Sequence, residues 1–180
     1  MYYGEKVFLR AYKEEDIPFA TKYMNDRELK KLLVTTIPFP MTPWEEEDFV
    51  KSQNSNNNGK YNFAIEDIES SKYIGGCGIN DINWLSRVAT VGIMIGDKDY
   101  WGKGYGTDAM KILVDFIFNN MNINKVKLGV FSFNERAIKS YKKCGFEVEG
   151  VLKDELFKDG KYHDEIIMAR FNKYRNQEYL

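Results

Sequence analysis

Two spacings of hydrophobic residues alternate along the chain. Segments in which apolar and polar residues alternate, as around Val7 and Leu9, predict strands with one buried face. Apolar, β-branched runs bounded by turn residues predict strands that are buried more fully. By these criteria the predicted strands are residues 5–12, 61–68, 72–80, 88–96, 124–131, 146–157 and 162–171. Three glycines within residues 72–80 also predict a bulge or a close backbone approach there.

Apolar residues three to four positions apart mark the helical segments. They predict helices within residues 13–33 (two short ones, divided at Asn25-Asp26), 43–52, 108–119 and 134–143. Thr42 and Glu45 form a capping box for the second region, Asn134 caps the last helix, and Gly145 closes it. The face expected in the core carries Ala109, Ile112, Leu113, Phe116 and Ile117.

The order of these elements predicts one domain over residues 1–180, with a core of about 5–171, in the α/β (α+β) class. We expect a mixed, mostly antiparallel sheet of six to seven strands flanked by helices. Its last two strands form a hairpin around Asp159-Gly160. The 43% hydrophobic and 15% aromatic content supports a sizeable core. Residues 53–59 are polar and are expected to be a mobile loop.

Charge and cysteine content narrow the classes of function. A net charge of −1 argues against a nucleic-acid binder, which would carry a basic stripe. No apolar run approaches the ~20 residues of a membrane span, and residues 1–6 lack the order of a signal peptide. Cys77 and Cys144 have no metal spacing, and a single histidine, His163, excludes a multi-histidine metal site. We therefore expect a cytoplasmic protein with reduced core cysteines and no metal.

The stretch Tyr100-Trp101-Gly102-Lys103-Gly104-Tyr105-Gly106-Thr107 stands where a predicted strand gives way to a predicted helix. The first N–H groups of a helix lack partners, and the helix dipole places partial positive charge there. Glycines let the backbone turn tightly and approach a ligand without a Cβ in the way. The stretch is therefore suited to a phosphate or pyrophosphate, and Lys103 adds a mobile positive charge.

Two nucleotide-binding motifs do not fit these glycines. The P-loop requires Gly-Lys-Ser/Thr, which the chain lacks. The dinucleotide fingerprint requires Gly-x-Gly-x-x-Gly and an acidic residue about 20 positions on. Here the spacing is Gly-x-Gly-x-Gly, and residues 120–124 carry no acid. On spacing alone, a tight turn without a ligand explains the glycines equally well.

A second block, Asn134…Tyr141…Gly145-Phe146, follows the glycines. Together with Trp101-Gly102-Lys103-Gly104-Tyr105-Gly106, it resembles the GNAT superfamily of acyl-CoA-dependent N-acetyltransferases, in particular the ribosomal-protein-alanine and spermidine types. The resemblance extends over residues 5–171 and is most specific over 89–146. It departs at Trp101, where the family usually has Gln or Arg, and this departure concerns one side-chain contact rather than the glycine cradle. The resemblance implies the GNAT fold, whose central strands splay apart to admit the cofactor arm.

The resemblance also implies acetyl-CoA as the donor. The loop that holds its pyrophosphate would comprise Trp101, Gly102, Lys103, Gly104, Tyr105, Gly106 and Thr107. The edge backbone of Ile93, Met94 and Ile95 would bind the pantetheine arm like an added strand, supported by the Asn134 side chain. Further cofactor contacts would come from Arg136, Ala137 and Lys143; the two cations could equally form the solvated face of a helix.

Tyr141 stands at the family's tyrosine position, on the same helical face as Asn134. The resemblance implies that its hydroxyl protonates the departing CoA thiolate; taken alone, Tyr141 could equally be a core aromatic residue. The base that takes the proton of the amine is assigned to Asp81 or His163. Glu47, Glu165 and a water chain remain as alternatives.

The implied function is direct attack of a primary amine on the thioester of acetyl-CoA. A protein N-terminal α-amine is the first expectation for the acceptor, and a polyamine or another small amine is the second. A non-catalytic acyl-CoA-binding or sensing module on the same fold is the alternative, because cofactor binding and catalysis use separable residues. No nucleic-acid or membrane partner is expected, and a monomer and a homodimer both fit.

Overall fold

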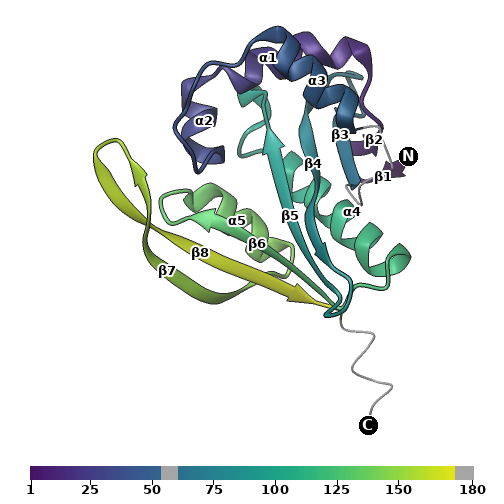
Figure 1. The fold of residues 1–180 in the computed structure, drawn as a ribbon. Helices are drawn as coiled ribbons and strands as arrows, with labels where there is room; N and C mark the ends of the chain where they lie inside the picture. The colour runs from purple at the N-terminus through teal and green to yellow at the C-terminus, as the bar shows by residue number, and fades with distance from the viewer. Residues whose placement is uncertain (54–60, 173–180) are drawn as a thin grey trace.

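A computed structural model describes residues 1–53 and 61–172 (Figure 1). The predicted polar loop at 53–59 lies outside these residues except for Gln53, the last residue of α3. The strands are β1 (Tyr2–Tyr3), β2 (Val7–Arg10), β3 (Tyr61–Asp67), β4 (Tyr73–Asn83), β5 (Val88–Ile95), β6 (Lys125–Phe131), β7 (Glu147–Lys158) and β8 (Lys161–Phe171). The helices are α1 (Ile17–Met24), α2 (Arg27–Leu33), α3 (Pro43–Gln53), α4 (Tyr105–Asn120) and α5 (Glu135–Lys143), and 3-10 turns occupy Glu14–Asp16 and Lys98–Tyr100.

The described strands form one mixed sheet of eight, in the order β1-β2-β3-β4-β5-β6-β8-β7. Every neighbouring pair is antiparallel except β5 and β6. The seven predicted strands are all present, and the eighth is β1, which pairs Tyr2 with Leu9 and Tyr3 with Phe8. A strand of two residues has no periodicity for a sequence pattern to detect, so the expected number was lower.

The sheet splits between β5 and β6 (Figure 1). These two strands pair in parallel only over residues 88–90 and 125–127. Beyond that point β5 stays with β4 as far as Ile95, while β6 stays with β8 as far as Phe131. The described residues thus leave one edge of β5, at residues 91–95, without a strand partner. This is the splayed central sheet that the resemblance implies.

Helices cover both faces of the sheet (Figure 1). Successive strand residues point to opposite faces, so Ile65 and Ile74 pack with α4, while Ala64 and Tyr73 pack with α1 to α3. The buried residues of α4 are Ala109, Met110, Leu113, Val114 and Ile117. Ile112 and Phe116, predicted to be core, are only partly buried because Met110 and Val114 take the central positions. None of the described helices is both long and apolar enough to cross a membrane.

Helix α4 begins at Tyr105, three residues earlier than predicted. Its first intrahelical bond runs from Asp108 N to Gly104 O, at 2.9 Å. Gly104 caps the helix in a left-handed conformation, with φ of 90°. The hydrophobic spacing does not extend into this first turn, so it did not predict the earlier start. The Asp108 carboxylate also accepts N–H bonds from Lys6 at 2.8 Å and Val7 at 3.1 Å. The start of α4 is thereby tied to β2.

The glycine-rich strand β4 contains the predicted close approach and the predicted bulge. A methyl group on Gly75 would lie 2.0 Å from the carbonyl oxygen of Met94 on β5, so only glycine fits there. The register then shifts between Ile79 and Asp81. This tight pairing keeps β5 against β4, and β6 is the strand that diverges.

The predicted break at Asn25-Asp26, the capping box and the hairpin turn are also present. The Asp26 side chain accepts the N–H of Leu29 at 2.9 Å, which starts α2 after the break. The Glu45 carboxylate accepts the N–H of Thr42 at 2.7 Å, as a capping box requires. Positive φ angles at Asp159 (49°) and Gly160 (76°) form the turn between β7 and β8.

Candidate active site

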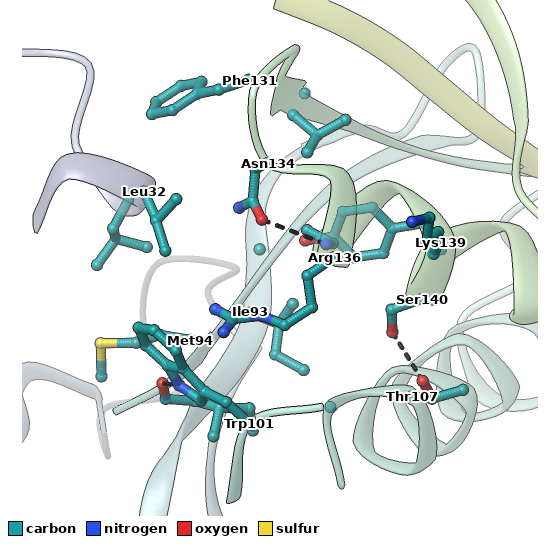
Figure 2. A pocket seen from close by; sticks show the side chains of 18 of the residues that line it. Leu32, Ile93, Met94, Trp101, Thr107, Phe131, Asn134, Arg136, Lys139 and Ser140 are labelled. Carbon is teal, nitrogen blue, oxygen red and sulfur yellow. Dashed lines mark hydrogen bonds between the residues drawn. The ribbon is translucent and has the colours of Figure 1, made fainter. Parts of the chain in front are cut away.

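A cleft of about 830 Å³ opens where β5 and β6 diverge, and its walls come mainly from α2, β5, β6, residues 101–107 and α5. Figure 2 shows Thr107 and Ser140 at one side of this cleft and Leu32 with Phe131 at the other, with Asn134 and Arg136 between them. We call the part formed by residues 101–107 and Ser140 the glycine end. The leucine end is formed by Leu29, Leu32, Leu33, Thr35, Phe131 and Glu165.

The glycine end is built from backbone. Gly102 (φ 73°) and Gly104 (φ 90°) adopt left-handed conformations that favour glycine. The N–H groups of Tyr105, Gly106 and Thr107 precede the first intrahelical bond of α4, so they have no acceptor within the helix. They lie at the positive end of the helix dipole. This geometry suits an anion with several oxygens, such as a pyrophosphate.

Trp101 and Arg136 form a stack beside the glycine turn. The indole N–H of Trp101 donates to the carbonyl oxygen of Ile95 at 2.7 Å, which fixes the plane of the ring. The guanidinium carbon of Arg136 lies 3.7 Å from the centre of that ring (Figure 2). Burial lowers the pKa of Arg136, while Glu28 raises it, and an arginine remains charged in either case. A cation is therefore held at the boundary between the glycine end and the β5 edge.

The middle of the cleft combines the edge of β5 with the start of α5. Ile93, Met94 and Ile95 line it from β5. The side-chain Oδ1 of Asn134 accepts the N–H of Ala137 at 3.2 Å, and this cap holds the side chain in the cleft (Figure 2). At the glycine end, the hydroxyls of Thr107 and Ser140 lie 2.8 Å apart and join α4 to α5.

Tyr141 lines the cleft from α5 and is partly buried. Its ring packs against Phe146 with centroids 6.0 Å apart. Burial, with a smaller contribution from Cys144, raises the pKa of Tyr141 to about 12. The hydroxyl therefore keeps its proton at neutral pH and is available as a proton donor.

The leucine end has apolar walls and one carboxylate. Glu165 lies opposite Phe131 in the pairing of β6 and β8. It approaches the backbone of β6 so closely that a methyl group on Gly129 would lie 2.0 Å from Oε1. Burial first, and the nearby charge of Glu155 second, raise the pKa of Glu165. A carboxylate in such a position favours a cationic group as its neighbour.

Most of the predicted site residues meet in this cleft. Those that line it are Ile93, Met94, Ile95, Trp101, Gly102, Gly104, Gly106, Thr107, Asn134, Arg136, Ala137, Tyr141 and Lys143. Lys103 is exposed beside the turn, and the ring of Tyr105 instead packs on Tyr100 with centroids 4.8 Å apart. In the described ranges, no cluster of three or more His, Cys, Asp or Glu side chains could hold a metal ion.

The structure does not bring the two predicted bases to the cleft. Asp81 is exposed just after the β4 bulge, and Asn80 lines the cleft in its place. His163 packs against Phe133 with ring centroids 4.8 Å apart. Glu165 was an alternative base in the sequence analysis, and the other residues of the leucine end were not predicted. No motif marks them, because they come from separate elements.

Comparisons with known proteins agree with this geometry. The acetyltransferase (GNAT) domain family matches residues 6–147. A Bacillus licheniformis N-acetyltransferase is 30% identical over 153 residues, which cover 84% of this chain and 85% of the relative. The spermidine N(1)-acetyltransferase of Vibrio cholerae is 28% identical over 161 residues, covering 89% and 90%. The Escherichia coli spermidine N(1)-acetyltransferase is 42% identical over 91 residues, covering 51% and 48%.

The fold has a solved counterpart as well. The crystal structure of spermidine N-acetyltransferase from Vibrio cholerae, in complex with CoA and spermine, superimposes with a TM-score of 0.81 at 28% identity. The match covers 92% of this chain and 95% of that one. With the family match over most of the chain, these similarities show that the chain belongs to the GNAT acetyltransferases, which take the acetyl group from acetyl-CoA.

Proposed function

We propose that this enzyme acetylates a primary amine of a small polycationic molecule of the polyamine type. The observation that carries the proposal is the opposite chemistry of the two ends of one cleft. The glycine end offers N–H groups and a cation to phosphates, and the leucine end offers a carboxylate between apolar walls. The spermidine acetyltransferase relatives support the polyamine in preference to a protein N-terminus, the acceptor first expected from the sequence.

The residues of the glycine end fit acetyl-CoA. The N–H groups of Tyr105, Gly106 and Thr107 would bind the pyrophosphate, and Arg136 would add charge to the phosphates. The β5 edge at residues 91–95 would bind the pantetheine amides as an added strand. Such alignment converts an encounter into a nearly unimolecular step, which is a large part of the rate enhancement.

The chemistry then requires two proton transfers. The neutral amine attacks the thioester carbonyl, the new C–N bond forms, and the C–S bond breaks. Tyr141 gives its proton to the departing thiolate, and its raised pKa keeps that proton available at neutral pH. The proton lost by the nitrogen returns to the tyrosinate directly or through water, so the products are the amide and free CoA thiol.

The test is release of CoA thiol from acetyl-CoA in the presence of different amines. We expect spermidine and spermine to be used with much higher kcat/KM than a dipeptide with a free N-terminus or a simple monoamine. A preference for the dipeptide would overturn the polyamine assignment. Binding of acetyl-CoA in calorimetry without thiol release for any amine would instead indicate a non-catalytic sensing module.

A further inference from the structure

Resting on this proposed function, we propose that Glu165 is the carboxylate that binds the ammonium group of the acceptor and takes its proton before attack. Glu165 lies on β8 opposite Phe131, and both residues line the cleft. Its carboxylate lies against Gly129 of β6, where a Cβ would stand 2.0 Å from Oε1. The absence of a Cβ on Gly129 is therefore what lets Glu165 occupy the cleft.

The Glu165 carboxylate has no hydrogen-bond or ion-pair partner within residues 1–53 and 61–172. A partly buried carboxylate without a partner is unfavourable, because it has lost part of its hydration and gained nothing in return. Burial accordingly raises its pKa. A bound ammonium would supply the missing partner, and the charge-assisted hydrogen bonds of such a pair are among the stronger ones.

The other cleft carboxylate does not compete for this role. Glu135 also lines the cleft, but it stands in the first turn of α5, is exposed, and pairs with Lys139 at 3.4 Å. The remaining lining of the leucine end is apolar or a neutral hydroxyl, from Leu29, Leu32, Leu33, Thr35 and Phe131. Within the described residues of that end, the charge that could attract a cation is therefore that of Glu165.

The charged groups around Glu165 leave its charge largely uncompensated. On β7, Glu155 adds a second negative charge and contributes to the raised pKa. Lys158 lies 5.9 Å from the centre of the Phe131 ring; its ammonium donates to the carbonyl oxygen of Val34, keeps its positive charge, and makes no ion pair with Glu165 among the described residues. These two carboxylates and one cation leave the surroundings of Glu165 net negative.

The other residues near Glu165 make their contacts with groups other than Glu165. On β8, Asp164 pairs with Lys153 at 2.7 Å, and His163 packs against Phe133. On α2, Lys31 pairs with Asp159. Across the cleft, Arg136 stacks on Trp101 and the Tyr141 hydroxyl is neutral.

The proton transfer balances with groups already named. An alkyl ammonium has a pKa of about 10, so the acceptor arrives protonated and cannot attack. The ammonium gives one proton to the Glu165 carboxylate, which becomes a neutral carboxylic acid, and the free nitrogen lone pair attacks the thioester. After the amide leaves, the acid returns its proton to water. A raised pKa makes Glu165 a better proton acceptor than an ordinary carboxylate, at the cost of protonation when the pH falls.

The experiment compares Glu165→Gln with the wild type, using spermidine as the acceptor. We expect kcat/KM to fall about 10²-fold, within the range for loss of a general base. The acidic limb of the wild-type pH profile should disappear, because it reports protonation of Glu165. Calorimetric titration of spermidine into the protein saturated with CoA should show weaker binding, while the affinity for acetyl-CoA stays unchanged. Glu147→Gln, an exposed carboxylate on β7, is the matched control.

Gly129→Ala provides a second, independent variant. It keeps the carboxylate but displaces it, since the new methyl group takes the place of Oε1. We expect weaker spermidine binding and a raised KM without loss of acetyl-CoA affinity. Spermidine affinity and a pH profile that match the wild type in both variants would overturn the proposal. If Glu165→Gln also loses acetyl-CoA binding, the spermidine affinity of Gly129→Ala becomes the test: weaker binding supports the proposal, and unchanged binding overturns it. A wild type that acetylates no amine would instead refute the proposed function.

Discussion

The glycine end and the leucine end of the cleft are constructed in different ways. Residues 101–107 are consecutive, and they present backbone N–H groups whose positions follow from local φ angles and the start of α4. The leucine end instead collects side chains from α2, β6 and β8, which are far apart in the sequence. A site made of backbone tolerates many side-chain changes, whereas a few substitutions can change the ligand of a site made of side chains.

The two ends also differ in charge. At the glycine end, the helix dipole and Arg136 are arranged for phosphates. At the leucine end, Glu165 supplies a carboxylate, and Glu155 adds negative charge near it. A reaction between acetyl-CoA and a polyamine requires both, and Tyr141 lies in the cleft that joins them. Substitutions should therefore separate into three groups, with effects on turnover, on acetyl-CoA affinity and on acceptor affinity.

The largest effect is expected for Tyr141→Phe, which removes only the hydroxyl. Turnover should fall by about 10²-fold or more, because the departing thiolate loses its proton donor. Affinities for acetyl-CoA and for spermidine should both stay close to the wild type in calorimetry, since neither end is altered. Tyr162→Phe, an exposed tyrosine on β8, is the control. Near-normal turnover in Tyr141→Phe would remove the residue from the mechanism.

An intermediate effect is expected for Gly104→Val. A β-branched residue in the left-handed region costs about 1–2 kcal/mol, and relief of that strain would move the N–H groups of α4 out of position. The dissociation constant for acetyl-CoA should rise roughly tenfold, and spermidine affinity should not change. The control is Gly150→Val on β7, where a side chain meets nothing within 4 Å. Equal weakening of both ligands would mean that the two ends are not independent.

The smallest effect is expected for Trp101→Ala, which leaves Arg136 without its aromatic support. A cation–π contact at a partly exposed site contributes about 0.5–1 kcal/mol, so acetyl-CoA should bind about two- to fivefold more weakly. The difference between variant and wild type should be measured by calorimetry at low and high salt. Trp44→Ala, at a tryptophan that is 66% exposed, is the control. An unchanged affinity would show that Arg136 is oriented without the stack.

Much of the fold could be predicted from the sequence because its signals are local. The seven longer strands, the break at Asn25-Asp26, the capping box at Thr42 and the hairpin turn at Asp159-Gly160 are all confirmed. The prediction missed the elements and boundaries that show no periodic spacing of hydrophobic residues. β1 has only two residues, and the first turn of α4 follows a left-handed glycine.

The glycine end was predictable for the same reason. Glycines before an amphipathic helix predict a tight turn and unpaired N–H groups at the start of the helix, because φ angles and the first N–H groups are properties of the local chain. The close approach of β4 to β5 was also predictable from the glycines of β4, since Gly75 leaves room for the Met94 carbonyl.

Only the tertiary structure determined which residues form the leucine end. Parallel pairing of β5 and β6 over three residues opens the cleft, and no segment of sequence encodes where two distant strands stop pairing. From the sequence, the base was assigned to Asp81 or His163, and Glu165 was one of the alternatives. The β4 bulge leaves Asp81 exposed outside the cleft, and the missing Cβ of Gly129 admits Glu165 to it. Side-chain sites depend on long-range packing, because the distances between their members are set by the whole sheet and not by the chain between them.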